Sequence, residues 1–450
     1  MSLFPFAALL AAAALITSPL AAQRLTLGEA LTRADTEAYA NRLARGSADA
    51  QSAEALGAFR GILPALRVEA GFVRTTDPIG AFGTTLRQRA ITPADFDPAR
   101  LNFPAAINNR VAALVLEQPL LNADAWVGRR AGAAATSAAQ ASVDWTRTDT
   151  RTDVVRAYFG ATLAREKLET LASAERAAQA HVARAKALAD TGLVTRSDAL
   201  LAEVRGGEVS AMRLAAAGDA AHAARALALL LGDPRASFEI PTTLPSAESI
   251  RALVAPDTSS LPMKERSDVA AAGLAMEAFR VEAWRAKAAY LPRLNGFARY
   301  DWNDPTGLFA NDKSWTVGVM ATWSPFAGAS EISEVRAANA RAESAEAQHE
   351  AAVGQAELER ARTLSELQVA LAQLDIAETA VAQSVEAHRI VALKYDGGLA
   401  TISDLLEASA IETRSRLGAS AARYHLIVSA AERRQALGDD PAFLNALTTP

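Results

Sequence analysis

Proline is absent from two long stretches of the chain, and this feature constrains the fold more than any other. The stretches are residues 120–233 and 326–440, which are 114 and 115 residues long and rich in Ala, Glu, Arg, Leu and Gln. Proline inside a helix costs about 3 kcal/mol, whereas these residue types are strong helix formers. Both stretches are therefore predicted to be helical, with one break in each, at residues 191–198 and 397–404.

The two breaks share the sequence Gly-Leu-x-Thr-x-Ser-Asp. Glycine is favoured just after a helix, and threonine followed three residues later by an acidic residue forms a capping box at the start of the next helix. Each break is thus predicted to reverse the chain. The helix before each break is about 68 residues long, or ~100 Å at 1.5 Å per residue, so these helices must coil together or stack.

Landmarks in the two halves of the chain are separated by a constant distance of 206 residues. The pairs are Pro119 and Pro325, Gly192 and Gly398, and Asp198 and Asp404. A constant offset over this span indicates an internal duplication. An earlier Leu-Pro-x-Leu motif, at residues 63–66 and 291–294, has an offset of 228, so the first copy carries 22 more residues. This insertion falls in the Gly-, Pro- and Asp-rich residues 75–109, which are predicted to form a long loop.

Between these prolines, apolar and polar residues alternate with a period of two, as in residues 66–72 and 316–323. Such alternation predicts strands with one apolar face. Each copy is expected to contain a β-hairpin, at residues 63–119 and 291–325, with two strands of about ten residues. That length suits a tilted strand crossing a bilayer.

Composition excludes several classes of protein. Alanine makes up about a quarter of the chain and aromatic residues only 6%, which favours long, closely packed helices over several compact domains. The net charge of −5 argues against a nucleic-acid partner. The chain has no cysteine and none of the common catalytic or nucleotide-binding motifs, so we expect neither an enzyme nor a metal or other cofactor.

The first residues of the chain are typical of an exported protein. Residues 1–22 carry no charged side chain and end in Ser18-Pro19-Leu20-Ala21-Ala22, which predicts a signal peptide cleaved after Ala22. The alternative is an uncleaved membrane anchor. Beyond this segment there is no apolar run of 18 residues or more, so no later transmembrane helix is predicted.

Four strands are too few to close a barrel, because membrane barrels begin at about eight. An open sheet in lipid would leave unpaired backbone groups that cost several kcal/mol each. If these strands lie in a membrane, several copies of the chain must therefore contribute strands to one barrel, with the long helices on one side. The alternative is a soluble periplasmic coiled-coil scaffold without a pore.

The chain resembles the TolC-like family of outer-membrane efflux proteins over nearly all of its length after residue 22. The matching motifs are Leu25-Thr26-Leu27-x-Glu29-Ala30-Leu31, Gln118-Pro119-Leu120-Leu121, Ser324-Pro325-Phe326 and Arg266-Ser267-Asp268-Val269, with the two Leu-Pro-x-Leu motifs and the two breaks. The resemblance implies a homotrimer with a 12-stranded barrel in outer-membrane lipid and a periplasmic α-barrel. It also implies a duct for small molecules or proteins, fed by an inner-membrane pump through a periplasmic adaptor protein. The cargo and the class of pump cannot be read from the sequence.

These observations predict a mostly helical chain with a membrane β-barrel portion and an internal repeat. The expected segments are a signal peptide (1–22), a first repeat (23–232), a proline-rich linker (233–264), a second repeat (265–438) and a C-terminal tail (439–450).

The resemblance places the two breaks at the periplasmic tips, where the adaptor docks. The candidate docking residues are Gly192, Leu193, Thr195 and Asp198 in the first break and Gly398, Leu399 and Thr401 in the second. The simpler interpretation is that glycine, threonine and aspartate are there only to reverse the helix.

Asp404 and Glu407 are three residues apart and so share one face of a helix. In a threefold assembly they would form two rings of carboxylates, which favour cations. The resemblance implies that they constrict the pore, with Tyr395 upstream; the alternatives are a helix cap for Asp404 and an ordinary solvated charge for Glu407. The family's best-known member has an arginine where this chain has Ala400, so Arg196 is considered as its replacement.

Histidine and aromatic residues form two further groups with recognisable positions in the sequence. His181 and His388 occupy near-equivalent positions in the two copies and are expected to be surface or helix-packing residues. Aromatic residues flank the second β-hairpin and are expected either to lie at the membrane interface or to pack within the barrel. They are Tyr300, Trp302, Trp315 and Trp323.

Overall fold

The computed structural model describes residues 23–258, 264–309 and 312–448. The predicted signal peptide at residues 1–22 lies outside this part of the chain. The chain divides into two compact units, and each takes segments from both halves of the sequence. The first unit comprises Met1–Leu43, Thr146–Lys264 and Leu358–Pro450, and the second comprises Ala44–Trp145 and Glu265–Glu357.

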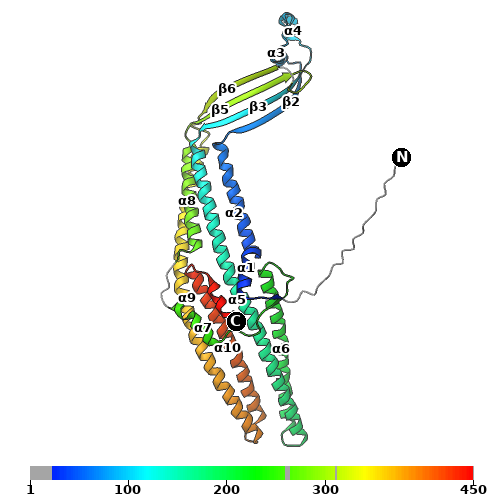
Figure 1. Ribbon diagram of the computed structural model, residues 1–450, viewed down its shortest axis with the longest axis vertical. Coiled ribbons are helices and arrows are strands. Elements are labelled where there is room, and N and C mark those ends of the chain that lie inside the picture. The colour runs from blue at the N-terminus through cyan, green and yellow to red at the C-terminus, as the bar shows by residue number, and fades with distance from the viewer. Residues whose placement is uncertain (1–22, 259–263, 310–311, 449–450) are drawn as a thin grey trace, which may run out of the picture. The chain divides into compact units, whose positions relative to one another are not determined.

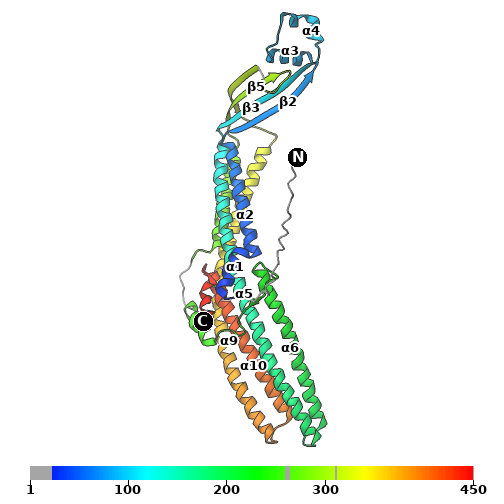
Figure 2. The same cartoon turned by 45° about the vertical axis from the view of Figure 1, so that its right-hand side comes forward.

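The first unit is almost entirely helical. Its elements are α1 (Leu27–Glu37), the start of α2 (Tyr39–Gly57), the C-terminal part of α5 (Ala123–Asp190), α6 (Arg196–Leu230), α7 (Ala247–Val254), the C-terminal part of α9 (Ser330–Asp396) and α10 (Ile402–Ala436). In this unit α5 runs beside α6, and α9 runs beside α10 (Figure 1 and Figure 2). The prediction of one break in each proline-free stretch is therefore confirmed.

Large apolar side chains from these helices form one core. Among the fully buried residues are Leu27, Tyr158, Phe159, Leu227, Leu231, Ile250, Leu367, Leu374, Leu426, Ile427 and Leu444. The Tyr158 hydroxyl donates a hydrogen bond of 2.9 Å to the carbonyl of Leu25, and burial raises the pKa of this tyrosine to about 12. The motif near the N-terminus acts locally: Thr26 and Glu29 form a capping box at the start of α1.

The second unit contains a four-stranded antiparallel sheet with the strand order β2-β3-β5-β6. The strands are β2 (Ala65–Thr75), β3 (Ile107–Leu121), β5 (Arg293–Asp304) and β6 (Asp312–Thr322). The unit also contains α8 (Ser267–Ala288), most of α2 and the N-terminal parts of α5 and α9. Both predicted β-hairpins are therefore present, and β3 is longer than expected, with 15 residues.

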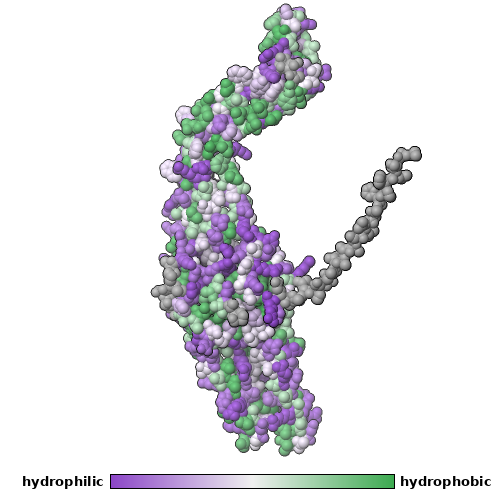
Figure 3. All heavy atoms as spheres, viewed as in Figure 1, coloured by the Kyte–Doolittle hydropathy of each residue, from purple (hydrophilic) through white to green (hydrophobic). Residues whose placement is uncertain are grey.

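The sheet has one apolar face and one polar face. One row across all four strands consists of Leu66, Leu116, Ala298 and Val317. The neighbouring row, which points to the opposite face, consists of Arg67, Val115, Arg299 and Thr316. Apolar side chains are frequent over the strands in the space-filling view, whereas hydrophilic ones are frequent over the helices of the first unit (Figure 3).

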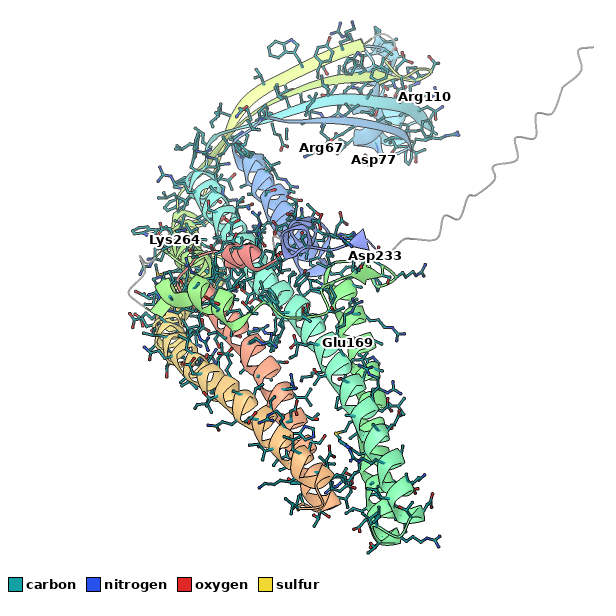
Figure 4. All side chains as sticks on the ribbon, turned by 60° about the horizontal axis from the view of Figure 1, so that its bottom comes forward. Arg67, Asp77, Arg110, Glu169, Asp233 and Lys264 are labelled. Carbon is teal, nitrogen blue, oxygen red and sulfur yellow. The ribbon has the colours of Figure 1, made fainter. Side chains whose placement is uncertain are left out.

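The polar face is held together by side-chain contacts. Arg299 donates to Asp301 at 2.8 Å and to Glu69 at 3.1 Å. The buried Asn109 donates to Asn303 at 2.9 Å. The strands form an arch in Figure 4, with Arg67 on its concave side. The concave side is therefore the polar one.

The prediction of a long loop at residues 75–109 is wrong, because much of this insertion is helical. It contains α3 (Pro78–Arg87), a 3₁₀ turn (Pro93–Phe96) and α4 (Pro98–Asn102). Three of the four prolines in this segment, Pro78, Pro93 and Pro98, stand in the first turn of a helix, where proline is favoured. Asp77 and Asp97 cap α3 and α4. The side chain of Gln88 donates to Asn109 at 3.0 Å, so the insertion is anchored on the polar face.

No helix within the described ranges combines the length and the apolar character that a membrane span requires.

Candidate functional site at the helix turns

Two glycines close the ends of the long helices. Gly192 follows α5 with a φ of 74°, and Gly398 follows α9 with a φ of 71°. The N–H of Gly192 donates to the carbonyl of Ala189 at 3.0 Å, and the N–H of Gly398 donates to the carbonyl of Tyr395 at 3.1 Å. A Cβ at either glycine would meet nothing within 4 Å. The backbone angle, rather than a lack of space, is therefore what requires glycine at these two positions.

The next helices begin with the predicted capping boxes. The Asp198 carboxylate accepts from the N–H of Thr195 at 3.1 Å and from its hydroxyl at 2.8 Å. The Asp404 carboxylate accepts from the same groups of Thr401, at 2.9 and 2.8 Å. Each aspartate N–H donates back to the threonine hydroxyl at 3.2 Å. The capping interpretation of both pairs is confirmed, and the docking role remains a prediction.

A large apolar side chain projects from each turn. Leu193 is 73% exposed and Leu399 is 81% exposed. Neither residue is needed for the capping bonds, because its side chain lies outside them.

A small apolar cluster, here called the seam cluster, joins the two hairpins just above their turns. Its buried members are Ala185 of α5, Ala199 and Ala202 of α6, Tyr395 of α9, and Ile402, Leu405 and Leu406 of α10. Helices α6 and α10 approach each other closely. The hairpins are therefore joined at this end by few large side chains.

The three predicted gate residues do not lie together. Asp404 and Glu407 are both exposed and share one face of the first turns of α10. Hydrogen bonds from the Thr401 N–H and hydroxyl hold the pKa of Asp404 below its usual value. Tyr395 is instead only 8% exposed and belongs to the seam cluster. The structure thus separates the two acids, which face solvent, from the tyrosine, which packs between the hairpins.

An arginine that the sequence interpretation overlooked contacts this tyrosine. Arg184 on α5 lies over the Tyr395 ring at 5.6 Å and forms a 2.7 Å ion pair with Asp396. These contacts connect the first hairpin to the second. The only signal in the sequence was that Arg184 stands about two turns before the first break, which does not show the direction of its side chain.

Ala400 stands at the position where the family resemblance implies an arginine. Ala400 packs against the seam cluster. In the described part of the chain Arg196 forms no ion pair, so it does not supply the missing contact within the subunit. Arg184 makes the cationic contact between hairpins, and Arg205 on α6 lies close enough to Glu407 to interact with it electrostatically.

Groups of three or more histidine, aspartate or glutamate side chains suited to a metal ion are absent from the described residues.

Several solved structures share this architecture of long helical hairpins and a four-stranded sheet. The Campylobacter jejuni CmeC outer membrane channel matches 92% of this chain and 85% of its own, with a TM-score of 0.76 and 17% identity. The match to the outer membrane protein VceC from Vibrio cholerae covers 92% of this chain and 96% of VceC, with a TM-score of 0.74 and 20% identity. The match to the open state of the Neisseria gonorrhoeae MtrE outer membrane channel covers 92% of this chain and 89% of MtrE, with a TM-score of 0.70 and 19% identity. At sequence identities this low, the structural similarity shows that the chain has the same fold as these proteins.

The family is shown by a match between the sequence and a protein-family model. The model of the outer membrane efflux protein family matches residues 29–233 and again residues 260–439, so the duplication is confirmed. The chain therefore belongs to the outer membrane efflux protein family, which is located in the outer membrane. No curated protein sequence matches the chain.

Proposed function

We propose that this protein is the outer-membrane exit duct of a tripartite export system. Three copies would form a 12-stranded barrel, with the helical hairpins continuing as a tube into the periplasm. An adaptor protein would dock at the turns, and an inner-membrane pump would supply small molecules or proteins for export. The observation that carries this proposal is the four-stranded sheet, which has one apolar face and two edges.

The edges require partners if the sheet lies in lipid. In the described part of the chain, β2 and β6 each pair with one strand only. Unpaired backbone groups are costly in a bilayer, and four strands are too few to close a barrel. In this antiparallel sheet β2 and β6 run in opposite directions, so β6 of one copy can pair with β2 of the next. Three copies joined in this way leave no free edge.

The apolar face suits lipid. Leu66, Val68, Val317 and Val319 are exposed on it. Trp315 of β6 and Trp323, which directly follows β6, stand eight positions apart, which is ~26 Å along an extended chain at ~3.3 Å per residue. The apolar band of a membrane barrel is about 25 Å tall and is bordered by aromatic residues. These two tryptophans are therefore suited to the two interfaces.

The tips supply docking and gating. Leu193 and Leu399 offer exposed apolar groups to an adaptor. Asp404 and Glu407, on the exposed side of α10, would line the narrowing tube as carboxylate rings. Tyr395 would act from the seam, by holding the second hairpin against Arg184 of the first.

Cysteine cross-linking tests the closed barrel, because the chain has no native cysteine. Val68→Cys on β2 is combined in turn with Trp315→Cys, Val317→Cys and Val319→Cys on β6. We expect one combination to give a disulfide-linked trimer in the outer-membrane fraction. A pair placed on neighbouring strands of one copy, Val68→Cys with Leu114→Cys, is the control and should give no intersubunit product. Monomers in every combination, released by osmotic shock, would instead support the soluble scaffold.

A further inference from the structure

Two histidines from different hairpins meet near the seam cluster. His181 lies on α5 and His388 on α9, with ring centroids 6.3 Å apart and an edge-to-face angle of 73°. The Nε2 atoms of both rings are enclosed and, among the described residues, have no hydrogen-bond partner. Buried polar atoms nearly always have a partner. The pair is therefore a place where a change of protonation would affect the packing.

Charged groups on the surrounding helices face the pair. The Glu412 carboxylate on α10 lies 2.6 Å from Nδ1 of His388, and Arg416 donates to the same carboxylate at 2.8 Å. Arg184 lies one turn from His181 on α5 and acts on it electrostatically. The contact between the hairpins thus contains two arginines and two carboxylates: Glu412 is engaged by His388 and Arg416, and Asp396 pairs with Arg184 at 2.7 Å.

A polar cavity of about 440 Å³ opens beside His388. Glu166 and Glu169 line it from α5 (Figure 4 labels Glu169), and Ser409 and Thr413 line it from α10. Glu166 is engaged by the Ser420 hydroxyl at 2.5 Å. The cavity gives water a route to the histidine side of the contact, so the pair can exchange protons although its Nε2 atoms are covered.

We propose that His181 and His388 form a pH-sensitive contact that holds the two hairpins together while His181 is neutral and releases them in acid. This inference rests on the proposed role of the hairpins in a gate. The neutral rings pack edge to face. A proton taken up by His181 adds a positive charge beside Arg184 and places an N–H donor where Nε2 has no acceptor.

The direction of the effect follows from linkage. Burial, and then electrostatic repulsion from the side chains of His388 and Arg184, lower the pKa of His181. The closed contact thus binds fewer protons than the open one. It keeps its full strength above the ordinary histidine pKa of about 6.5 and weakens as the pH falls below that value, by at most about tenfold per pH unit for each proton taken up.

Thiol accessibility measures release of the contact directly. Ser384 is buried one turn before His388 on α9, and Ser384→Cys supplies a single, nearly isosteric thiol. The full-length protein is labelled with a methanethiosulfonate at about pH 8 and about pH 5.5, with and without His181→Gln. At each pH, the labelling rate of the protein with His181 is divided by the rate of the His181→Gln protein. This ratio cancels the pH dependence of the thiol's own reactivity. We expect equal rates at pH 8 and about tenfold faster labelling of the histidine protein at pH 5.5.

Two further variants make the test specific. His181→Lys carries a charge at both pH values and should label rapidly at both. His222→Gln removes an exposed histidine of α6 and should leave the pH dependence unchanged. Trimer formation on a gel confirms that each variant folds; if the lysine variant does not, the glutamine comparison alone decides. Equal labelling rates at pH 5.5 with and without the His181→Gln substitution would overturn the proposal.

Single-channel conductance separates this inference from the proposed function. If acid raises conductance in the wild type but not in His181→Gln, both the histidine contact and the proposed gate are supported. If acid raises labelling but leaves conductance unchanged, the histidine contact stands and the gate fails. If acid raises conductance equally in both proteins, the histidine contact is overturned, whatever else opens the channel.

Discussion

The two helix turns of this protein have the same construction but different surroundings. Each has a glycine with positive φ, an exposed leucine after it, and a threonine and aspartate that form a capping box. These shared features are what any sequence needs in order to reverse two long helices. They explain why the turns occur, and they do not by themselves assign a function to either one.

The differences lie in residues that the turn does not require. At the offset of 206, Tyr395 corresponds to Ala189 and Glu407 corresponds to Leu201. The capping aspartate therefore has an acidic neighbour on its helix face only in the second copy. Under the proposed function, the first turn would serve folding and docking, whereas the second would also carry the gate.

Replacing the glycines disrupts the positive-φ conformation that the two turns share, and it has the largest expected effect. Gly192→Val and Gly398→Val place a β-branched residue at positive φ, which costs roughly 1–2 kcal/mol or more and distorts the turn. We expect either variant to abolish export, measured as drug sensitivity or secretion, while trimers still form. Asparagine tolerates this conformation, so Gly192→Asn and Gly398→Asn are the controls. Normal export in the valine variants would refute docking at the tips.

Removing Arg184 weakens the contact between the two turns. Arg184→Ala loses both the ion pair with Asp396 and the contact with the Tyr395 ring. We expect several-fold higher conductance of the reconstituted channel at neutral pH, because the second hairpin is no longer held. Arg389→Ala is the matched control, since Arg389 pairs with Glu386 on its own helix. Equal conductance in the two variants would show that Arg184 does not hold the gate.

Neutralising the capping aspartates sharpens the difference between the turns. Asp404→Asn with Glu407→Gln removes the proposed carboxylate rings and should reduce cation selectivity and block by divalent ions. Asp198→Asn changes the equivalent cap in the first copy and should leave both properties unchanged. Reversal potentials in a salt gradient measure the effect. If the two changes have the same consequence, the gate assignment fails.

The sequence predicted the parts of this molecule that depend on local chemistry. Proline spacing, glycine and the Thr-x-x-Asp pattern act within a few residues, and the helix breaks and capping boxes are present as expected. The alternation in the hairpins predicted the two faces of the sheet for the same reason. The resemblance to the TolC-like family agrees with the family match.

Features that depend on contacts between distant segments could not be predicted. The insertion was expected to be a loop, because Asp-Pro is favoured both in turns and at the start of a helix. Tyr395 was grouped with the acids because the family resemblance implies a tyrosine upstream of them, yet its side chain packs into the seam cluster. Arg184 and its partner Asp396 are 212 positions apart, and nothing local marks them as a pair.

Removing the capping threonines should have the smallest effect and tests whether the turns differ in charge as well as in packing. Thr195→Ala and Thr401→Ala each lose a helix cap, which costs about 1 kcal/mol, and faster amide exchange at the start of α6 or α10 should report it equally. Thr401→Ala should also raise the pKa of Asp404 part of the way towards its usual value, because it removes the hydrogen bond from the Thr401 hydroxyl while the bond from the backbone N–H remains. With Glu407→Gln present, loss of cation selectivity on acidification should then begin at a higher pH, towards the ordinary aspartate value of about 3.9. A titration unaffected by Thr401→Ala would mean that Asp404 does not face the ion path.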